Sequence, residues 1–136
     1  MVLNQATEYG MRTILFLAKQ KEGHVIDADT ISSTEKIPKR FLFKIMLSLT
    51  KDGLVESVRG RNGGFILGRD SHDITLYDII KSIEGSIIVS HCLSSPDKCS
   101  KDATGYCAIH KSMAKLRQEL VQQLQNTNIK MLLESA

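Results

Sequence analysis

The stretch that decides the fold is residues 37–67, IPKRFLFKIMLSLTKDGLVESVRGRNGGFIL. Its first part predicts a helix, because apolar residues recur at spacings of three and four and Pro38 stands at a position favoured in a first turn. The apolar stripe consists of Phe41, Leu42, Ile45, Met46 and Leu49. Gly53 is expected to end this helix, since glycine is common just beyond a helix C-terminus.

A β-hairpin is predicted directly after Gly53. The segments 54–58 and 65–67 have the composition of short strands, and a glycine-rich turn with two arginines separates them. Asn62-Gly63 is a strong hairpin signal, because both central positions of the favoured two-residue turn need positive φ. The second strand should therefore pair with the first.

The residues before this stretch predict two more helices. Residues 4–20 carry apolar positions at helical spacing, and 28–35 form a shorter segment with Asp27 as its N-cap. A short break around Ile37 joins the second helix to the third, so residues 28–52 are a candidate helix-turn-helix. With the hairpin as a wing, the fold class is mainly α with a small β wing, a winged helix-turn-helix.

The C-terminal half predicts one more short helix and a long one. Thr75 to Asp78 fits a capping box at the start of a helix that Gly85 should close, whereas residues 86–106 show no usable periodicity. A long helix is expected from about Cys107 to Thr127, with a single apolar stripe. The stripe consists of Ile109, Met113, Leu116, Leu120 and Leu124. Such a helix needs a partner, and we expect self-association into a homodimer.

We therefore expect three segments. Residues 1–85 form the winged helix-turn-helix domain, 86–106 form a cysteine-rich loop, and 107–136 form the dimerisation helix with a C-terminal tail whose conformation the sequence leaves open. A length of 136 residues suits one domain with an appended element, and a 42% hydrophobic share excludes a disordered or fibrous chain.

Charge and cysteine content narrow the class of function. The net charge is only +3, but residues 36–69 contain eight Lys and Arg against two acidic residues, which is the pattern of a phosphate-backbone binder. We expect a cytoplasmic protein, because neither a signal peptide nor a membrane-spanning stretch is apparent. Three cysteines, an odd number, then favour metal or redox chemistry over disulfides.

The third helix and the wing supply the DNA-binding candidates. The first turns of the third helix should enter the major groove and present Lys39, Arg40, Phe43 and Lys44. Arg40 is the best candidate for reading a base edge, because arginine can bind guanine bidentately. Phe43 could contact a thymine methyl or belong to the core. The wing candidates, Arg59 and Arg61, flank the turn and suit a narrow minor groove.

These motifs, taken together, resemble the Rrf family of bacterial transcriptional regulators. The similarity rests on the runs 37–42, 49–55 and 57–67, and extends to 9–12 in the first helix and to 74–85 before the cysteines. The resemblance implies a winged-helix homodimer in which long C-terminal helices cross between subunits. It also implies double-stranded palindromic operator DNA as the partner.

The cysteines Cys92, Cys99 and Cys107 are separated by six and seven residues. This spacing is too wide for a Cys-x2-Cys zinc ribbon, and by itself it leaves an iron–sulfur cluster, zinc or unliganded thiols open. Cluster-binding members of the Rrf family carry three cysteines in the same place, so the resemblance favours an iron–sulfur cluster. The sequence does not distinguish a 2Fe-2S from a 4Fe-4S cluster.

Two residues compete for a fourth ligand position. His110 lies one helical turn after Cys107 and resembles the fourth ligand of the cluster-biogenesis regulators in the family. Glu8 resembles the acidic ligand of nitric-oxide- and redox-sensing members, where the carboxylate comes from the other subunit. We favour Glu8, because a cluster that bridges subunits couples its state to the DNA-binding geometry. His91, adjacent to Cys92, is a poor candidate, because its side chain would have to turn sharply to reach the same cluster.

The sequence thus predicts a homodimeric transcriptional regulator, of repressor type, that senses redox state, nitric oxide or iron–sulfur status through a cysteine-ligated cluster. The alternative within the class is a cluster-free, thiol-sensing repressor of the cysteine-metabolism type. An iron–sulfur carrier or assembly factor is the alternative from another class, but it would need neither a wing nor a recognition helix. We expect no enzyme, no small-molecule substrate and no membrane, since no Ser-His-Asp or paired-carboxylate spacing stands out.

Overall fold

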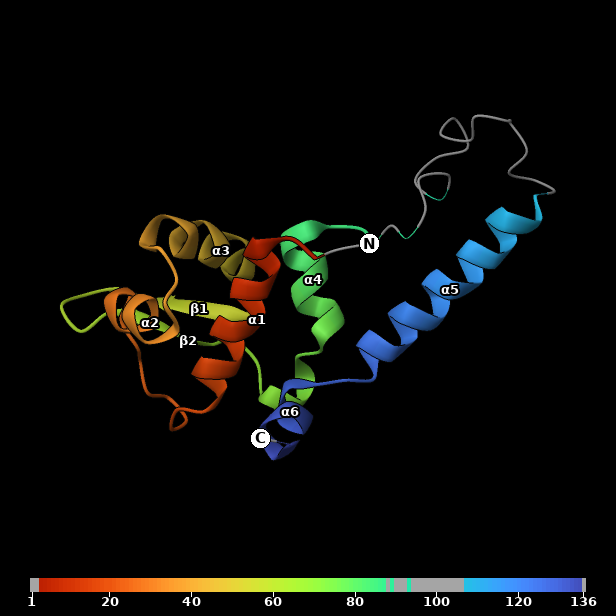
Figure 1. The fold of residues 1–136 in the computed structure, drawn as a ribbon. Coiled ribbons are helices and arrows are strands. Elements are labelled where there is room, and N and C mark those ends of the chain that lie inside the picture. Colours follow the sequence, from red (N-terminus) through yellow and green to blue (C-terminus); the bar gives the residue numbers. More distant parts are fainter. Residues whose placement is uncertain (1–2, 88, 90–92, 94–106, 136) are drawn as a thin grey trace.

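The computed structural model describes residues 3–87, 89, 93 and 107–135 (Figure 1). Six α-helices, one 3-10 helix and a two-stranded antiparallel sheet occur in this part of the chain. The elements are α1 (Gln5–Ala18), α2 (Ala28–Glu35), α3 (Lys39–Lys51), β1 (Val55–Val58), β2 (Gly64–Leu67), η1 (Ser71–Asp73), α4 (Leu76–Glu84), α5 (Ala108–Gln125) and α6 (Ile129–Ser135). The order helix, helix, recognition helix and wing confirms the predicted fold class.

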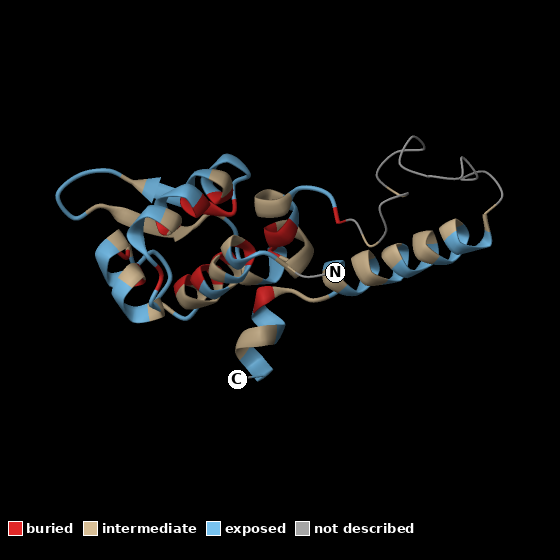
Figure 2. Ribbon diagram, turned by 45° about the horizontal axis from the view of Figure 1, so that its top comes forward, coloured by how far each residue is buried: buried red, intermediate tan, exposed pale blue. Residues whose placement is uncertain are grey.

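The hydrophobic core lies where α1, α3 and α4 meet, and the hairpin and α6 cover its sides (Figure 2). Its buried side chains include the predicted stripe of α3 except Phe41, which is only partly buried. Each fully buried Leu or Ile contributes about 1.5–3 kcal/mol relative to an exposed one. The buried members of that stripe are Leu42, Ile45, Met46 and Leu49. Helix α3 is thereby held with its opposite side facing outward.

The turn between α2 and α3 is short and tightly bonded. Asp27 caps α2 as predicted, and hydrogen bonds from Thr30 hold the pKa of its carboxyl below the usual value. At the other end Lys36 adopts the left-handed conformation, with φ 55° and ψ 49°. Ile37 donates its N–H to the Ser32 carbonyl at 3.0 Å, and the Ser32 hydroxyl donates to the Ile37 carbonyl at 2.6 Å. These bonds fix the angle at which α3 leaves α2.

The hairpin forms as predicted, but its turn is different. Val58 pairs with Gly64, so five residues separate the strands, and Gly63 donates its N–H to the Gly60 carbonyl at 3.0 Å. Positive φ is found at Gly60, at 115°, and at neither Asn62 nor Gly63. The expectation of positive φ at Asn62 and Gly63 is therefore wrong, because in this five-residue loop Gly60 supplies the special backbone conformation.

The hairpin is also fixed to the residues before α2. Ile26 and Phe65 exchange backbone hydrogen bonds at 3.1 and 2.9 Å, so a third short extended segment lies beside β2. A Cβ atom added to Gly64 would lie 2.2 Å from the Ile26 carbonyl oxygen. Glycine is therefore required at this position by the close approach of two backbones.

The C-terminal half contains the predicted capping box and long helix. Thr75 and Asp78 bond reciprocally at 3.0 and 3.1 Å, and Gly85 follows the last turn of α4 with φ 85°. Helix α5 extends away from the helical body, and none of its residues is buried (Figures 1 and 2). No helix in the described part of the chain is long and apolar enough to cross a membrane.

After α5 the chain returns to the winged-helix domain, a feature that the sequence left open. Helix α6 lies against α1 and η1, and Ile129 at its start is fully buried. The Leu76 N–H donates to the Thr127 carbonyl and the Ile129 N–H to the Ile74 carbonyl, both at 2.9 Å. The C-terminal end of α5 is thereby tied to the start of α4.

Candidate functional site

The outward side of α3 carries the residues predicted to contact DNA. Lys39, Arg40, Phe43 and Lys44 are all exposed, opposite the buried stripe. Phe43 is 50% exposed, which excludes the alternative that it belongs to the core. Three cations and one aromatic ring therefore stand together on the first two turns of this helix.

Arg40 is held by a chain of aromatic and guanidinium contacts that links α3 to α1. Its guanidinium carbon lies 5.1 Å from the centroid of the Phe41 ring, and Phe41 lies 6.2 Å from Tyr9. Arg12 lies 5.3 Å from the Tyr9 centroid and donates to the Glu35 carbonyl at 2.8 Å. Each exposed cation–π contact contributes about 0.5–1 kcal/mol, enough to favour one orientation of Arg40.

Lys39 is placed differently from Arg40, because it forms an ion pair with Asp29 of α2. Both side chains are more than half exposed, at 53% and 71%, so solvent screens the attraction. A phosphate group can therefore compete with Asp29 for Lys39. The pair also keeps the lysine at the N-terminal end of α3.

The two wing arginines lie in the loop between β1 and β2, which projects from the body of the molecule (Figure 1). Arg59 and Arg61 are both exposed. The Gly60–Gly63 hydrogen bond holds the loop backbone, and a Cβ atom added at Gly63 would lie 2.4 Å from the Val58 carbonyl oxygen, so the loop requires glycine there. The arginines are thus carried on an ordered backbone at the edge of the domain.

The metal candidates are only partly covered by the structure. Cys92 and Cys99, like His91, lie outside the described residues. Cys107 is the N-cap residue of α5, is partly exposed and makes no capping hydrogen bond. Within the described ranges no three His, Cys, Asp or Glu side chains form a group that could hold a metal ion.

The two candidate fourth ligands lie on different helices. Glu8 is an exposed residue in the first turn of α1, and His110 is a partly buried residue in the first turn of α5. Neither is distinguished by its position within one chain, so the choice between them stays a prediction. No sequence signal pointed to Arg117, whose Nε donates to the Ile87 carbonyl at 2.7 Å and ties α5 to the start of the 86–106 segment.

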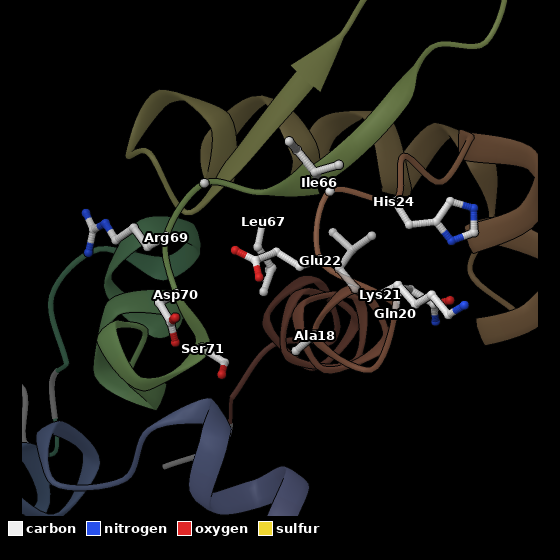
Figure 3. A pocket seen from close by; sticks show the side chains of 13 residues that line it. Ala18, Gln20, Lys21, Glu22, His24, Ile66, Leu67, Arg69, Asp70 and Ser71 are labelled. Carbon is white, nitrogen blue, oxygen red and sulfur yellow. The ribbon is translucent and has the colours of Figure 1, made fainter.

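A cavity of about 390 Å³ lies apart from all of these residues (Figure 3). It is bounded by the end of α1 and the loop after it on one side, and by β2 and the segment leading to η1 on the other. Its lining combines charged side chains such as Glu22, Arg69 and Asp70 with apolar ones such as Leu17. None of the predicted DNA or metal residues lines it.

Comparisons with known proteins agree with this architecture. The Rrf2 family, described as "Iron-dependent Transcriptional regulator", matches residues 3–135. A protein of Aquifex aeolicus assigned as an HTH-type transcriptional regulator is 32% identical over 130 residues, which cover 96% of this chain and 90% of that protein. The HTH-type transcriptional regulator NsrR of Bacillus subtilis is 33% identical over 95 residues, which cover 70% of this chain and 65% of NsrR.

Solved structures of two kinds of regulator have the same fold. IscR of T. potens has a TM-score of 0.79 at 23% identity, with 99% of this chain and 88% of that one covered. CymR, the global cysteine regulator of B. subtilis, has a TM-score of 0.80 at 25% identity, with 100% and 98% covered. A family match along nearly the whole chain and a winged helix with a basic recognition helix lead to one conclusion: the chain belongs to the Rrf2 family of transcriptional regulators.

Proposed function

We propose that this chain is a homodimeric regulator that binds palindromic operator DNA and senses redox state, nitric oxide or iron–sulfur status through a cysteine-ligated cluster. The observation that carries the DNA-binding part is the outward side of α3, where Arg40 and Lys44 stand opposite the buried stripe. The wing arginines, Arg59 and Arg61, add positive charge on a second element. Such an arrangement suits a helix in the major groove and a wing on the neighbouring minor groove.

Helix α5 supports the homodimer. Two residues of its apolar stripe are exposed within one chain, Ile109 at 70% and Leu116 at 52%, and the other three are only partly buried. An 18-residue helix without a buried residue gains stability when a second copy covers this stripe. A two-fold dimer would place two α3 helices on successive half-sites of a palindrome.

The donor set supports the cluster. Cys92, Cys99 and Cys107 supply three thiolates, the ligands that iron–sulfur clusters prefer, and Glu8 of the other subunit is our candidate for the fourth position, with His110 as its competitor. When bound, the cluster would supply a group that reacts with oxidants or nitric oxide. The chain's own part is to hold it beside α5, because Cys107 is the N-cap of that helix.

The cluster is tested on protein purified without oxygen. We expect stoichiometric iron and acid-labile sulfide per dimer with a visible absorption band, and loss of all three in Cys99→Ala. Ser100→Ala, a neighbouring substitution of similar size, is the matched control and should retain them. A wild-type protein that contains only zinc, or no metal, would refute the cluster.

Regulation is tested by DNA titration of the cluster-loaded and cluster-free forms. A switch requires a difference in affinity between the two states, and equal binding to every operator tested would refute sensing. Replacing Glu8 and His110 separately by alanine then assigns the fourth ligand, since only the true ligand should change the absorption spectrum.

A cluster-free, thiol-sensing repressor is the second candidate. It is favoured by the similarity to CymR, whose structure covers the whole of this chain at a TM-score of 0.80. This candidate predicts no iron after anaerobic purification and a DNA affinity that changes when the thiols are oxidised.

A further inference from the structure

The outward side of α3 contains an apolar element between its cations. Arg40, Lys44, Leu47 and Lys51 stand at spacings of four, three and four residues, so they share one face of the helix. Leu47 is 74% exposed, the highest value among the exposed large hydrophobic side chains of the described residues. Phe43, four residues earlier and 50% exposed, is its neighbour on the helix surface.

This placement is not explained by the packing of the domain. The buried stripe of α3 lies on the opposite side of the helix, with Leu42 and Leu49 fully buried. An exposed leucine adds little to the free energy of folding, so folding does not explain Leu47. Its neighbours on this face are Lys44 and Lys51, which place it at the centre of a positively charged surface. Charge complementarity selects a polyanion as the occupant of that face, and DNA offers one apolar group in its major groove, the 5-methyl of thymine.

We propose that Phe43 and Leu47 form a thymine-methyl reading strip, so that this protein selects half-sites with thymines at defined positions. The inference rests on the proposed DNA-binding function and specifies which bases in the DNA the protein recognises. Leu47 lies seven residues beyond Arg40, about 10 Å along the helix axis. If α3 lies along the groove, this span corresponds to roughly three base pairs at about 3.4 Å per step. Leu47 would therefore read a thymine about three base pairs from the guanine that Arg40 would contact, and Phe43, three residues beyond Arg40, a thymine about one base pair from it.

The expected size of the effect follows from apolar burial. Covering one methyl group with an apolar side chain is worth about one buried CH₂ group, which corresponds to roughly a four-fold change in affinity. A half-site that places one methyl on Phe43 and another on Leu47 should then lose about sixteen-fold when both methyls are removed.

The test uses the full-length protein and DNA duplexes selected from a random pool. Dissociation constants are measured for the selected duplex and for the same duplex with deoxyuridine in place of single thymidines, which removes only the methyl. The wild type should lose about four-fold at the contacted thymines, and Leu47→Ala should bind the thymidine and deoxyuridine duplexes equally at its position. Phe43→Ala should do the same at a different thymine.

Met131→Ala is the matched control, because Met131 is also an exposed large apolar residue, 46% exposed, but lies on α6. This variant should keep the full sensitivity to deoxyuridine. The inference is overturned if the wild type binds both duplexes equally, while DNA binding as such then stands. It is also overturned if Leu47→Ala keeps the sensitivity and instead weakens dimerisation, which would make the strip a contact between copies. Absence of any DNA binding at low salt would refute the proposed function together with this inference.

Discussion

Replacing Lys36 by glycine should stabilise the protein. Lys36 ends α2 with φ 55°, a left-handed conformation that costs an L-residue roughly 1–2 kcal/mol. Glycine removes this cost but increases the entropy of the unfolded chain, which offsets about 0.4–1 kcal/mol. The net gain in the free energy of unfolding is therefore about 0.5–1 kcal/mol. For a chain of this size, that gain corresponds to a rise in Tm of about 2–4 °C.

The assay is urea unfolding followed by circular dichroism, at one fixed protomer concentration because the stability of the proposed dimer depends on it. Lys36→Gly should raise the urea midpoint at an unchanged m-value. Lys36→Ala is the matched control, since it removes the same charge and side chain but keeps the Cβ atom that is crowded in the left-handed region. A glycine variant no more stable than the alanine variant would show that Lys36 is not strained.

Three further changes test other parts of the structure. Gly64→Ala should lower the free energy of unfolding by about 1–3 kcal/mol, because its Cβ would meet the Ile26 carbonyl oxygen at 2.2 Å; an unchanged urea midpoint would contradict this close approach. Ile129→Ala should cost about 2–5 kcal/mol, whereas Met131→Ala, exposed on the same helix, should cost less than about 0.5; equal effects would mean that α6 is not anchored through Ile129. Arg61→Gln should make the slope of log K against log salt shallower by about 1.8 per dimer if each wing arginine neutralises one phosphate, and an unchanged slope would remove Arg61 from the interface.

Local periodicity was enough to predict most of the winged-helix domain. Helix α3 was predicted from one apolar stripe, and Leu42 and Leu49 are indeed fully buried. The capping box at Thr75 and the N-cap at Asp27 were predicted as well, because each depends on residues only three positions apart. Features set within one or two helical turns are therefore readable from the sequence.

Features that depend on contacts between residues far apart in the sequence were not predicted. Helix α6 spans only seven residues, too few for a periodic signal, and it is held through Ile129 by contacts with α1 and η1. The stack between Tyr9 and Phe41 joins two helices whose relative placement no local pattern gives. Positive φ was wrongly expected at Asn62 and Gly63, because this pair is favourable in a two-residue turn, whereas the actual register leaves five residues between the strands.

The residues of the candidate site also fall into those that the sequence predicted and those that it did not. The α3 and wing residues were predicted from their place in a helix-turn-helix, and the structure exposes all of them. Leu47 was missed as a site residue although it stands outside the predicted buried stripe of α3, and its 74% exposure shows that it lies on the outward side. The proposed metal ligands include residues 92 and 99, which lie outside the described part, and Glu8, which is proposed to act from a second subunit.

The return of the chain after α5 makes the C-terminal end of that helix a pivot, and the Arg117–Ile87 hydrogen bond holds the helix at its middle. Its C-terminal end is tied through Thr127 to the start of α4, whereas its other end, at Ala108, is the far end of an arm about 27 Å long. A rotation of roughly 5° about the pivot would displace that end by about 2 Å. Conversely, a small displacement of the N-terminal end of α5, beside Cys107, would tilt this helix slightly where it contacts the start of α4 in the winged-helix domain.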